Sequence, residues 1–177
     1  NTMEYITIAS IGNAQDFGDL PSVREQNAGT SSPTRGLSMG GLTPSNTDVI
    51  EFITLSSLGD AQDFGDLINS GNVLGGGTGN ATRGIVMGGA SQTNLIQYIT
   101  ITSTGNATNF GDLTDGRNDV ATGSSPTRAV CVGGLTPSDT QIMDYITIST
   151  TGNATDFGTS NKVFRTSFGL SNGHGGL

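Results

Sequence analysis

Three arginines stand at matching places in three similar segments of the chain, each just before an apolar run. They are Arg35, Arg83 and Arg128. A guanidinium group binds a carboxylate through two parallel hydrogen bonds, so a row of these side chains could hold an acidic sugar or another carboxylate. In the alternative, each arginine pairs with an aspartate of its own segment or of the next one. We favour this structural pairing and keep the three arginines as the candidate binding residues.

Aspartates gather around a recurring Asp-Phe-Gly tripeptide. The spaced carboxylates are Asp16, Asp19, Asp60, Asp63 and Asp66. Carboxylate oxygens can bind calcium, but Asn109 and Thr159 replace two of these positions in other segments. We therefore expect the aspartates to cap turns or to pair with Arg24 and Arg117. The prediction is that the chain has no cofactor, with calcium as the alternative.

The chain has few groups suited to catalysis. Asp-Phe-Gly holds magnesium in protein kinases, but the lysine strand, catalytic loop and glycine-rich nucleotide loop of a kinase are absent from this sequence. The single histidine, His174, stands in a glycine-rich stretch, so one chain can form neither a Ser-His-Asp triad nor a multi-histidine metal site. We expect no enzyme activity. A glycoside hydrolase that uses two carboxylates is the alternative.

Charge limits the choice of partners. The formal net charge is -8, which repels phosphate backbones and anionic lipids, so we expect neither nucleic acid nor a membrane as a partner. The one cysteine, Cys131, lies in an apolar run and should be a buried small hydrophobe.

The elements that must position these side chains occur four times. Each copy opens with Glu, Gln or Asp, followed by an aromatic residue and Ile-Thr, and the copies start 47, 46 and 47 residues apart, at Glu4, Glu51, Gln97 and Asp144. A period of roughly 20 to 50 residues is typical of propellers, solenoids and arrays. Glycine (28 residues), threonine, serine and asparagine are abundant, which predicts an all-β fold. We expect a single repeat domain, 1–177, with copies at approximately 1–45, 46–92, 93–139 and a shortened 140–177.

Each copy has the same internal order. An apolar strand leads to a Gly-Asn or Gly-Asp turn, then to a Phe, a variable loop rich in Gly, Ser and Thr, and a second apolar strand ending in a glycine pair. This order predicts three or four strands per copy. The recurring phenylalanines should be equivalent buried anchors: Phe17, Phe64, Phe110 and Phe157.

This order resembles the kelch repeat of β-propellers. The residues that carry the resemblance are Gly40-Gly41, Phe52 and Phe64 in one copy, and Gly88-Gly89, Tyr98, Phe110 and Arg117 in the next. Phe stands where the kelch family usually has Trp, and the two aromatics are further apart. The resemblance implies a β-propeller of about four kelch-like blades of roughly 47 residues.

Ring closure is a further expectation. The glycine pair returns at Gly175-Gly176, so the segment Phe168 to Leu177 should pair with Tyr5 to Ile8 and hide two strand edges. Asn1-Thr2 matches Asn46-Thr47, which indicates a start inside a repeat, and hence processing or a longer parent protein.

These observations predict a non-catalytic structural or binding module whose loops face a protein or a glycan. The style of the repeat is also similar, more loosely, to repeat proteins in virions of aquatic bacteriophages. That similarity implies a virion surface or tail-fibre component, located on the virion or outside the cell. The partners would be other structural proteins or surface glycans, and the chain could form a homo-oligomer or part of a larger assembly. A secreted lectin or adhesin is the alternative within the binding class.

Overall fold

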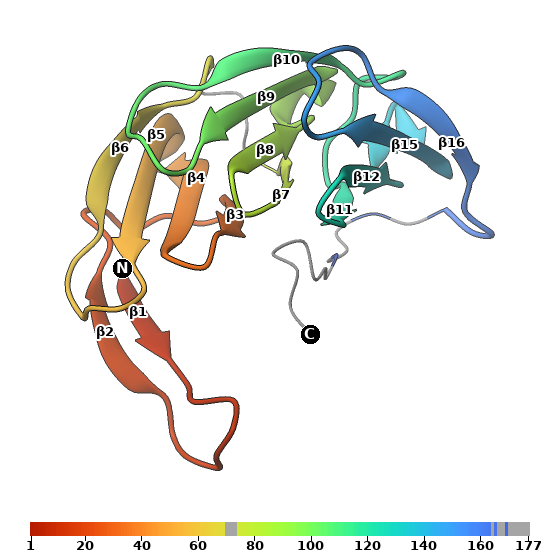
Figure 1. Ribbon diagram of the computed structural model, residues 1–177. Helices are drawn as coiled ribbons and strands as arrows, with labels where there is room; N and C mark the ends of the chain where they lie inside the picture. Colours follow the sequence, from red (N-terminus) through yellow and green to blue (C-terminus); the bar gives the residue numbers. More distant parts are fainter. Residues whose placement is uncertain (70–73, 164, 166–168, 170–177) are drawn as a thin grey trace.

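The computed structural model describes residues 1–69, 74–163, 165 and 169. The chain forms an all-β structure of four successive units (Figure 1). Unit 1 is an antiparallel hairpin of β1 (Thr2–Tyr5) and β2 (Gln15–Asp19). Unit 2 is the four-stranded sheet of β3 (Ala28–Ser31), β4 (Arg35–Thr43), β5 (Ser45–Thr54) and β6 (Gln62–Asp66).

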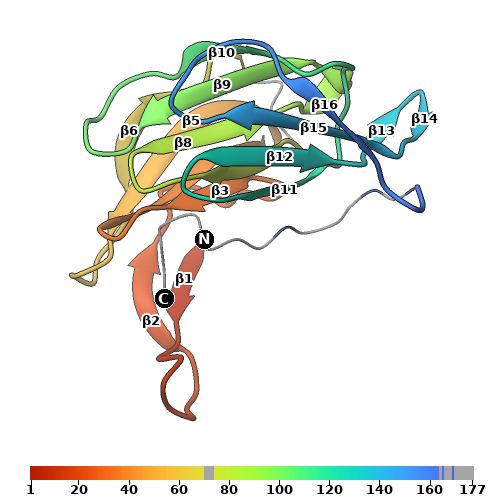
Figure 2. The same cartoon turned by 45° about the vertical axis from the view of Figure 1, so that its right-hand side comes forward.

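The next two units repeat this antiparallel order. Unit 3 contains β7 (Gly76–Gly79), β8 (Arg83–Met87), β9 (Leu95–Thr100) and β10 (Thr108–Asp112). Unit 4 contains β11 (Ala121–Ser124), β12 (Arg128–Val132), β15 (Ile142–Thr147) and β16 (Thr155–Thr159). The loop from β8 to β9 holds a short 3-10 turn, Ala90–Gln92. The loop from β12 to β15 forms a ribbon of β13 (Leu135–Thr136) and β14 (Ser138–Asp139), which projects beyond the sheets (Figure 2).

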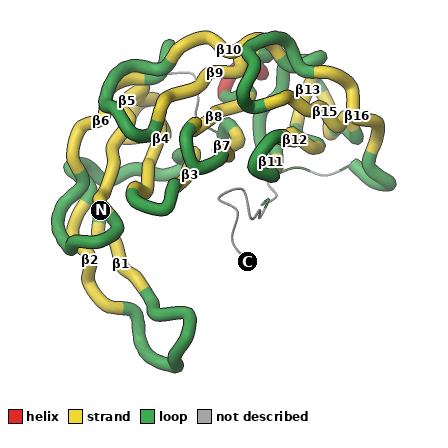
Figure 3. The backbone as a smooth tube through the Cα atoms, viewed as in Figure 1, coloured by secondary structure: helices red, strands yellow, loops and turns green. Residues whose placement is uncertain are grey.

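The units follow one another along an open arc (Figure 3). Strands β3, β7 and β11 lie next to one another on its inner side, and the hairpin of unit 1 lies at the opposite end of the arc from β16. No strand pairing within the described ranges joins β1 or β2 to β16. The segment expected to close the ring, Phe168 to Leu177, falls almost entirely outside the described residues.

Each Asp-Phe-Gly tripeptide, and the Asn-Phe-Gly tripeptide that replaces it in unit 3, builds a bulge in the outermost strand of its sheet. The register shifts by one residue at this point between the third and fourth strands of units 2, 3 and 4, and between the two strands of unit 1. The glycine after the Phe has a positive φ, for example +139° at Gly65 and +150° at Gly111, which favours glycine. In units 1 and 4 the aspartate accepts the N–H of its own glycine, as from Gly18 to Asp16 and from Gly158 to Asp156. Asp-Phe-Gly is therefore a strand bulge.

The core lies between the sheets. One cluster joins Leu37, Met39 and Phe64 of unit 2 to Ile99 and Ile101 of unit 3. A second cluster packs unit 3 against unit 4 in the same way. Unit 3 contributes to both clusters, with Ile99 and Ile101 in the first and Ile85 and Met87 in the second, so both faces of its sheet are buried.

Three of the four phenylalanine anchors are buried as predicted. The exposed fraction is 8% for Phe17, 2% for Phe64 and 3% for Phe110. The prediction is wrong for Phe157, which is 53% exposed. Phe157 has the same edge-to-face contact with a neighbouring tyrosine as Phe17 and Phe110. It differs because no described unit follows unit 4 to cover the outer face of its sheet.

Candidate functional site

The Gly-Asn and Gly-Asp turns connect each unit to the preceding one. The turn of unit 3 is typical. The Gly105 N–H donates to the Phe64 carbonyl at 2.7 Å, and the Ala107 N–H donates to the Asp66 carbonyl at 2.7 Å. The Asn106 Oδ1 accepts the Asp66 N–H at 3.0 Å. We call this set of three hydrogen bonds the inter-unit clip.

The inter-unit clip occurs at all three junctions of the arc. Asp60 and Asn153 accept the N–H groups of Asp19 and Asp112 at 2.9 and 3.1 Å, and the flanking backbone bonds are also present. Hence Asp60 binds backbone of another unit, and the expectation that it pairs with Arg24 or Arg117 is wrong. Among the described residues, no group of three or more His, Cys, Asp or Glu side chains is placed to hold a metal ion.

The three candidate arginines lie on the same side of the arc as the clips. Each guanidinium stacks on an aromatic ring of the neighbouring strand: Arg35 on Phe52 at 4.4 Å, Arg83 on Tyr98 at 4.5 Å and Arg128 on Tyr145 at 4.8 Å. Such cation–π contacts contribute about 0.5–2 kcal/mol. The structure does not bring the three together at one site, since each belongs to a different sheet.

Two of these arginines also link units. Arg35 Nη1 donates to the Ile101 carbonyl at 2.7 Å, and Arg83 Nη1 donates to the Ile148 carbonyl at 2.6 Å. The preferred interpretation of an ion pair with a repeat aspartate is therefore wrong for these two residues. The aromatic strand that follows each arginine in sequence supplies the ring, and the next unit supplies the carbonyl.

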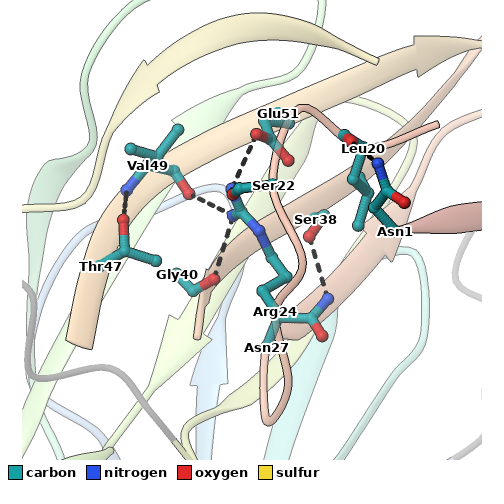
Figure 4. Close-up of polar contacts among 10 residues, drawn as sticks. All are labelled: Asn1, Leu20, Ser22, Arg24, Asn27, Ser38, Gly40, Thr47, Val49 and Glu51. Carbon is teal, nitrogen blue, oxygen red and sulfur yellow. Dashed lines mark hydrogen bonds and ion pairs between the residues drawn. The ribbon is translucent and has the colours of Figure 1, made fainter. Parts of the chain in front are cut away.

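Two buried ion pairs were not predicted. Arg24 Nη2 lies 2.7 Å from Glu51 Oε1, and its Nη1 donates to the carbonyls of Gly40 and Val49 at 3.2 Å (Figure 4). Arg117 Nη2 lies 2.7 Å from Asp144 Oδ2. The four side chains are at most 3% exposed. Each pair joins the connection after one unit to the third strand of the next.

The sequence did contain a signal for these pairs. Glu51 of unit 2 comes after a connection that contains Arg24, and Asp144 of unit 4 comes after a connection that contains Arg117. The equivalent residue in unit 3 is neutral Gln97, and the connection before it has no arginine. Gln97 is fully buried and its Oε1 accepts the N–H of Ile68 at 2.7 Å. Comparing the copies for matched changes of charge would have found this position.

Burial raises the pKa of one member of these pairs, Glu51, and of a cysteine beside the other pair, Cys131. Loss of water raises the pKa of Glu51 above its usual value, the Arg24 charge opposes this rise, and the Asp63 charge adds to it. Burial raises the pKa of the Cys131 thiol to about 11, with Arg117 opposing the rise. Cys131 is buried as predicted, and a thiol with so high a pKa is a poor nucleophile.

The loops that differ between copies lie on the opposite edge of the sheets. In an antiparallel meander the first and third turns lie at one end and the second turn and the exit at the other. The clips occupy the first of these ends. The other end, which we call the variable edge, carries the loops from second to third strand and the connections between units. The exposed residues of these loops include hydroxyl and amide side chains and also carboxylates: Ser45, Asn46, Ser91, Asn94 and Ser138, and Glu25, Asp115 and Asp139.

Strained backbone also gathers at the variable edge. All five described residues that have a positive φ and are not glycine lie there: Gln26, Leu74, Ser91, Gln92 and Asp119. Three of them form a row from unit to unit, with the Leu74 N–H donating to the Gln26 carbonyl and the Asp119 N–H donating to the Leu74 carbonyl, at 3.3 and 2.9 Å. Such conformations cost about 1–3 kcal/mol each and persist where the surroundings hold them.

This row borders an inner cavity of about 570 Å³. Its wall combines glycine backbone of β3 and β7 with the side chains of Gln26, Asn27, Asp119 and Thr122. Asp119 is the only charged residue in the described lining. The described lining therefore offers amide, hydroxyl and backbone groups and one carboxylate beside three apolar side chains, with no cation among these residues. The inner cavity and the variable edge together form the candidate functional site.

A second cavity, of about 490 Å³, lies between the hairpin and unit 2. Met3 and Leu20 line one side, and Gly36, Ser38 and Ile53 line the other. It exists because unit 1 has two described strands where the other units have four.

Comparison with protein-family models gives no match for this chain, and comparison with curated proteins gives no significant match. Within the described part of the chain, no helix is long and apolar enough to span a membrane.

Proposed function

We propose that the chain is a non-catalytic binding module whose units are blades of a kelch-like β-propeller, and that it binds a neutral glycan at the inner cavity and variable edge. Three four-stranded meanders packed face to face around their first strands support the propeller. The single observation that carries the ligand class is the lining of the inner cavity, where amides, a hydroxyl and backbone groups meet one carboxylate.

The arginines do not favour an acidic ligand. The guanidinium groups of Arg35 and Arg83 already stack on aromatic rings and donate hydrogen bonds to carbonyls of the next unit. Both arginines lie at the end of the sheets that carries the clips, away from the variable edge. A ligand at the inner cavity would instead meet the side chains of Gln26 and Asp119 and backbone groups, which can form hydrogen bonds with sugar hydroxyls. The repeated residues hold the units together, while the residues that vary form the site, as expected for loops that carry specificity on a rigid scaffold.

We place this module on the surface of a virus particle, as a virion surface or tail-fibre component. The similarity of its repeats to those of bacteriophage virion proteins supports this location.

Glycan-array binding tests the proposal. Gln26→Gly and Asp119→Gly delete side chains of the cavity, and glycine tolerates the φ of +58° and +55° at these positions. Thr102→Ala, in an exposed turn on the clip side, is the matched control. We expect a loss of affinity of tenfold or more in both glycine variants and wild-type affinity in the control.

Three outcomes would contradict the proposal. Unchanged glycan binding in both glycine variants would place the ligand elsewhere. Release of cleaved sugar would indicate a hydrolase. Binding to no glycan, together with purification of the chain outside virus particles, would remove both the ligand class and the location.

A further inference from the structure

The two ends of the arc carry complementary halves of the interface that joins the units inside it. The interfaces between units 2 and 3 and between units 3 and 4 have three parts: the inter-unit clip, an arginine that donates to a carbonyl of the next unit, and isoleucines of the later unit buried against the earlier one. We call the surface of Ile6, Ile8 and residues 11–14 the leading face. The trailing face is formed by Arg128, Tyr145 and residues 157–159.

The leading face exposes residues that are buried in later units. Ile6 and Ile8 are 63% and 95% exposed. Their equivalents in units 3 and 4 are at most 3% exposed: Ile99, Ile101, Ile146 and Ile148. The turn Gly12-Asn13-Ala14 has the residue types of the turns that form clips, and it projects from the end of the arc (Figure 3). At about 25 cal/mol per Å², covering such isoleucines is favourable.

The trailing face has the matching groups. A side-chain carbon at Gly18, Gly65 or Gly111 would lie 2.3–2.6 Å from a glycine carbonyl of the next unit. Gly158 has a similar φ of +125°, and its nearest neighbour would be the tip of Met143 at 3.9 Å. Arg128 stacks on Tyr145 as Arg35 and Arg83 stack on their rings, but its guanidinium has no carbonyl acceptor among the described residues. Within the described part of the chain, no turn of a further unit lies against Gly158.

Charged residues at the two ends of the arc, and one glycine beside β11, also correspond to residues found at the internal interfaces. Glu4 is exposed and occupies the position of Glu51 and Asp144. Arg165, which pairs with Asp139 at 3.5 Å, follows Phe157 at nearly the distance that separates Arg24 and Arg117 from their phenylalanines. Gly169 lies against the backbone of Thr122, as Gly77 of unit 3 lies against Gly29 of unit 2.

We propose that the leading face of one chain docks on the trailing face of a second copy, reproducing the internal interface between molecules. A second copy fits because the two faces of one chain lie at opposite ends of the arc (Figure 1). The contact is heterologous, so association continues until a ring closes or a filament grows. This inference depends on the inter-unit contacts and not on the glycan, and its test uses no ligand.

Three blocking variants, one on the leading face and two on the trailing face, test the direction of docking. Ile8→Lys places a charge on the leading face at a residue that is 95% exposed, so folding should be unaffected. Gly158→Ala adds one carbon where the docking carbonyl would come, and Arg128→Ala is a second trailing variant that creates no backbone strain. Circular dichroism and thermal unfolding confirm that each variant folds.

Analytical ultracentrifugation over a concentration series gives the result. We expect the wild-type chain to form assemblies of two or more copies and each single variant to stay monomeric. Mixing Ile8→Lys with Gly158→Ala or with Arg128→Ala should restore one intact interface, so the mass should double and grow no further. A wild-type chain that stays monomeric at every concentration, or a mixture that does not dimerise, overturns the proposal. Self-dimers of the single variants also overturn it, because they would require a symmetric contact.

A disulfide trap separates docking between chains from closure within one chain. Asp19 and Asp60, which form a clip, are equivalent to Thr159 and Asn13. The double variant Asn13→Cys, Thr159→Cys should give covalent dimers and larger species on oxidation, with each single variant as control. A cross-linked monomer would show instead that the chain closes its own ring.

Discussion

Replacing Gly65 by alanine should cost much more stability than replacing Gly158 by alanine. Both residues stand in the same Phe-Gly bulge with a positive φ, +139° at Gly65 and +125° at Gly158. The strain of an alanine there, about 1–3 kcal/mol, is therefore common to the two variants. They differ in what the new methyl group meets.

At Gly65 the added carbon would lie 2.6 Å from the carbonyl oxygen and carbon of Gly105 and 2.9 Å from Asn106 Oδ1. The turn must withdraw, and the three hydrogen bonds of the inter-unit clip are weakened or lost. At about 0.5–1.5 kcal/mol for each net hydrogen bond, the loss is roughly 2–4 kcal/mol. At Gly158 the nearest described atom is 3.9 Å away, so only the strain remains.

The assay is urea unfolding of Gly65→Ala and Gly158→Ala beside wild type, at a concentration where ultracentrifugation shows monomers. We expect the free energy of unfolding of Gly65→Ala to be about 2–4 kcal/mol below that of Gly158→Ala. Its transition should broaden, because weakening one interface in an array of units reduces cooperativity. Equal costs for the two variants would refute the view that these glycines serve the contact between units.

Four further predictions concern single side chains. Phe64→Ala should cost about 3–5 kcal/mol and Phe157→Ala clearly less, because Phe157 is half exposed; similar values from thermal unfolding would contradict the assignment of the core. Arg24→Ala should cost about 3–5 kcal/mol, since it leaves Glu51 buried without its partner, and adding Glu51→Gln should recover part of that loss; a double-mutant cycle that shows additivity would disprove the coupling. Because burial raises the pKa of Glu51 in the folded state, the folded chain binds this proton more tightly than the unfolded chain does. The stability of wild type relative to Glu51→Gln should therefore fall as pH rises above about 4.5. Unfolding measurements between pH 4 and 7 in which this relative stability rises with pH would refute the prediction. Cys131, with its pKa of about 11, should react with a thiol reagent at pH 8 only after unfolding, and fast labelling of the native chain would show that the site is open.

The repeat by itself determined the elements of each unit. Strands, turns and the Phe-Gly bulge depend on residues close in sequence, and they recur because each copy carries the same local pattern. The all-β class, the buried Phe64 and the buried Cys131 could be predicted for that reason. The change from Glu51 to neutral Gln97 in step with the loss of an arginine was also visible in the sequence.

Only the tertiary structure decided which partner each of these residues has. Phe64 and Phe157 stand in nearly identical segments, yet one is buried and the other half exposed, because burial depends on whether another unit covers the sheet. Arg35 donates to a carbonyl 66 residues away, and any unit can supply such an acceptor, since every residue has one. Local sequence sets the geometry of a unit. Contacts between units are set by the order and angle in which the units stack, and that information is distributed over many residues.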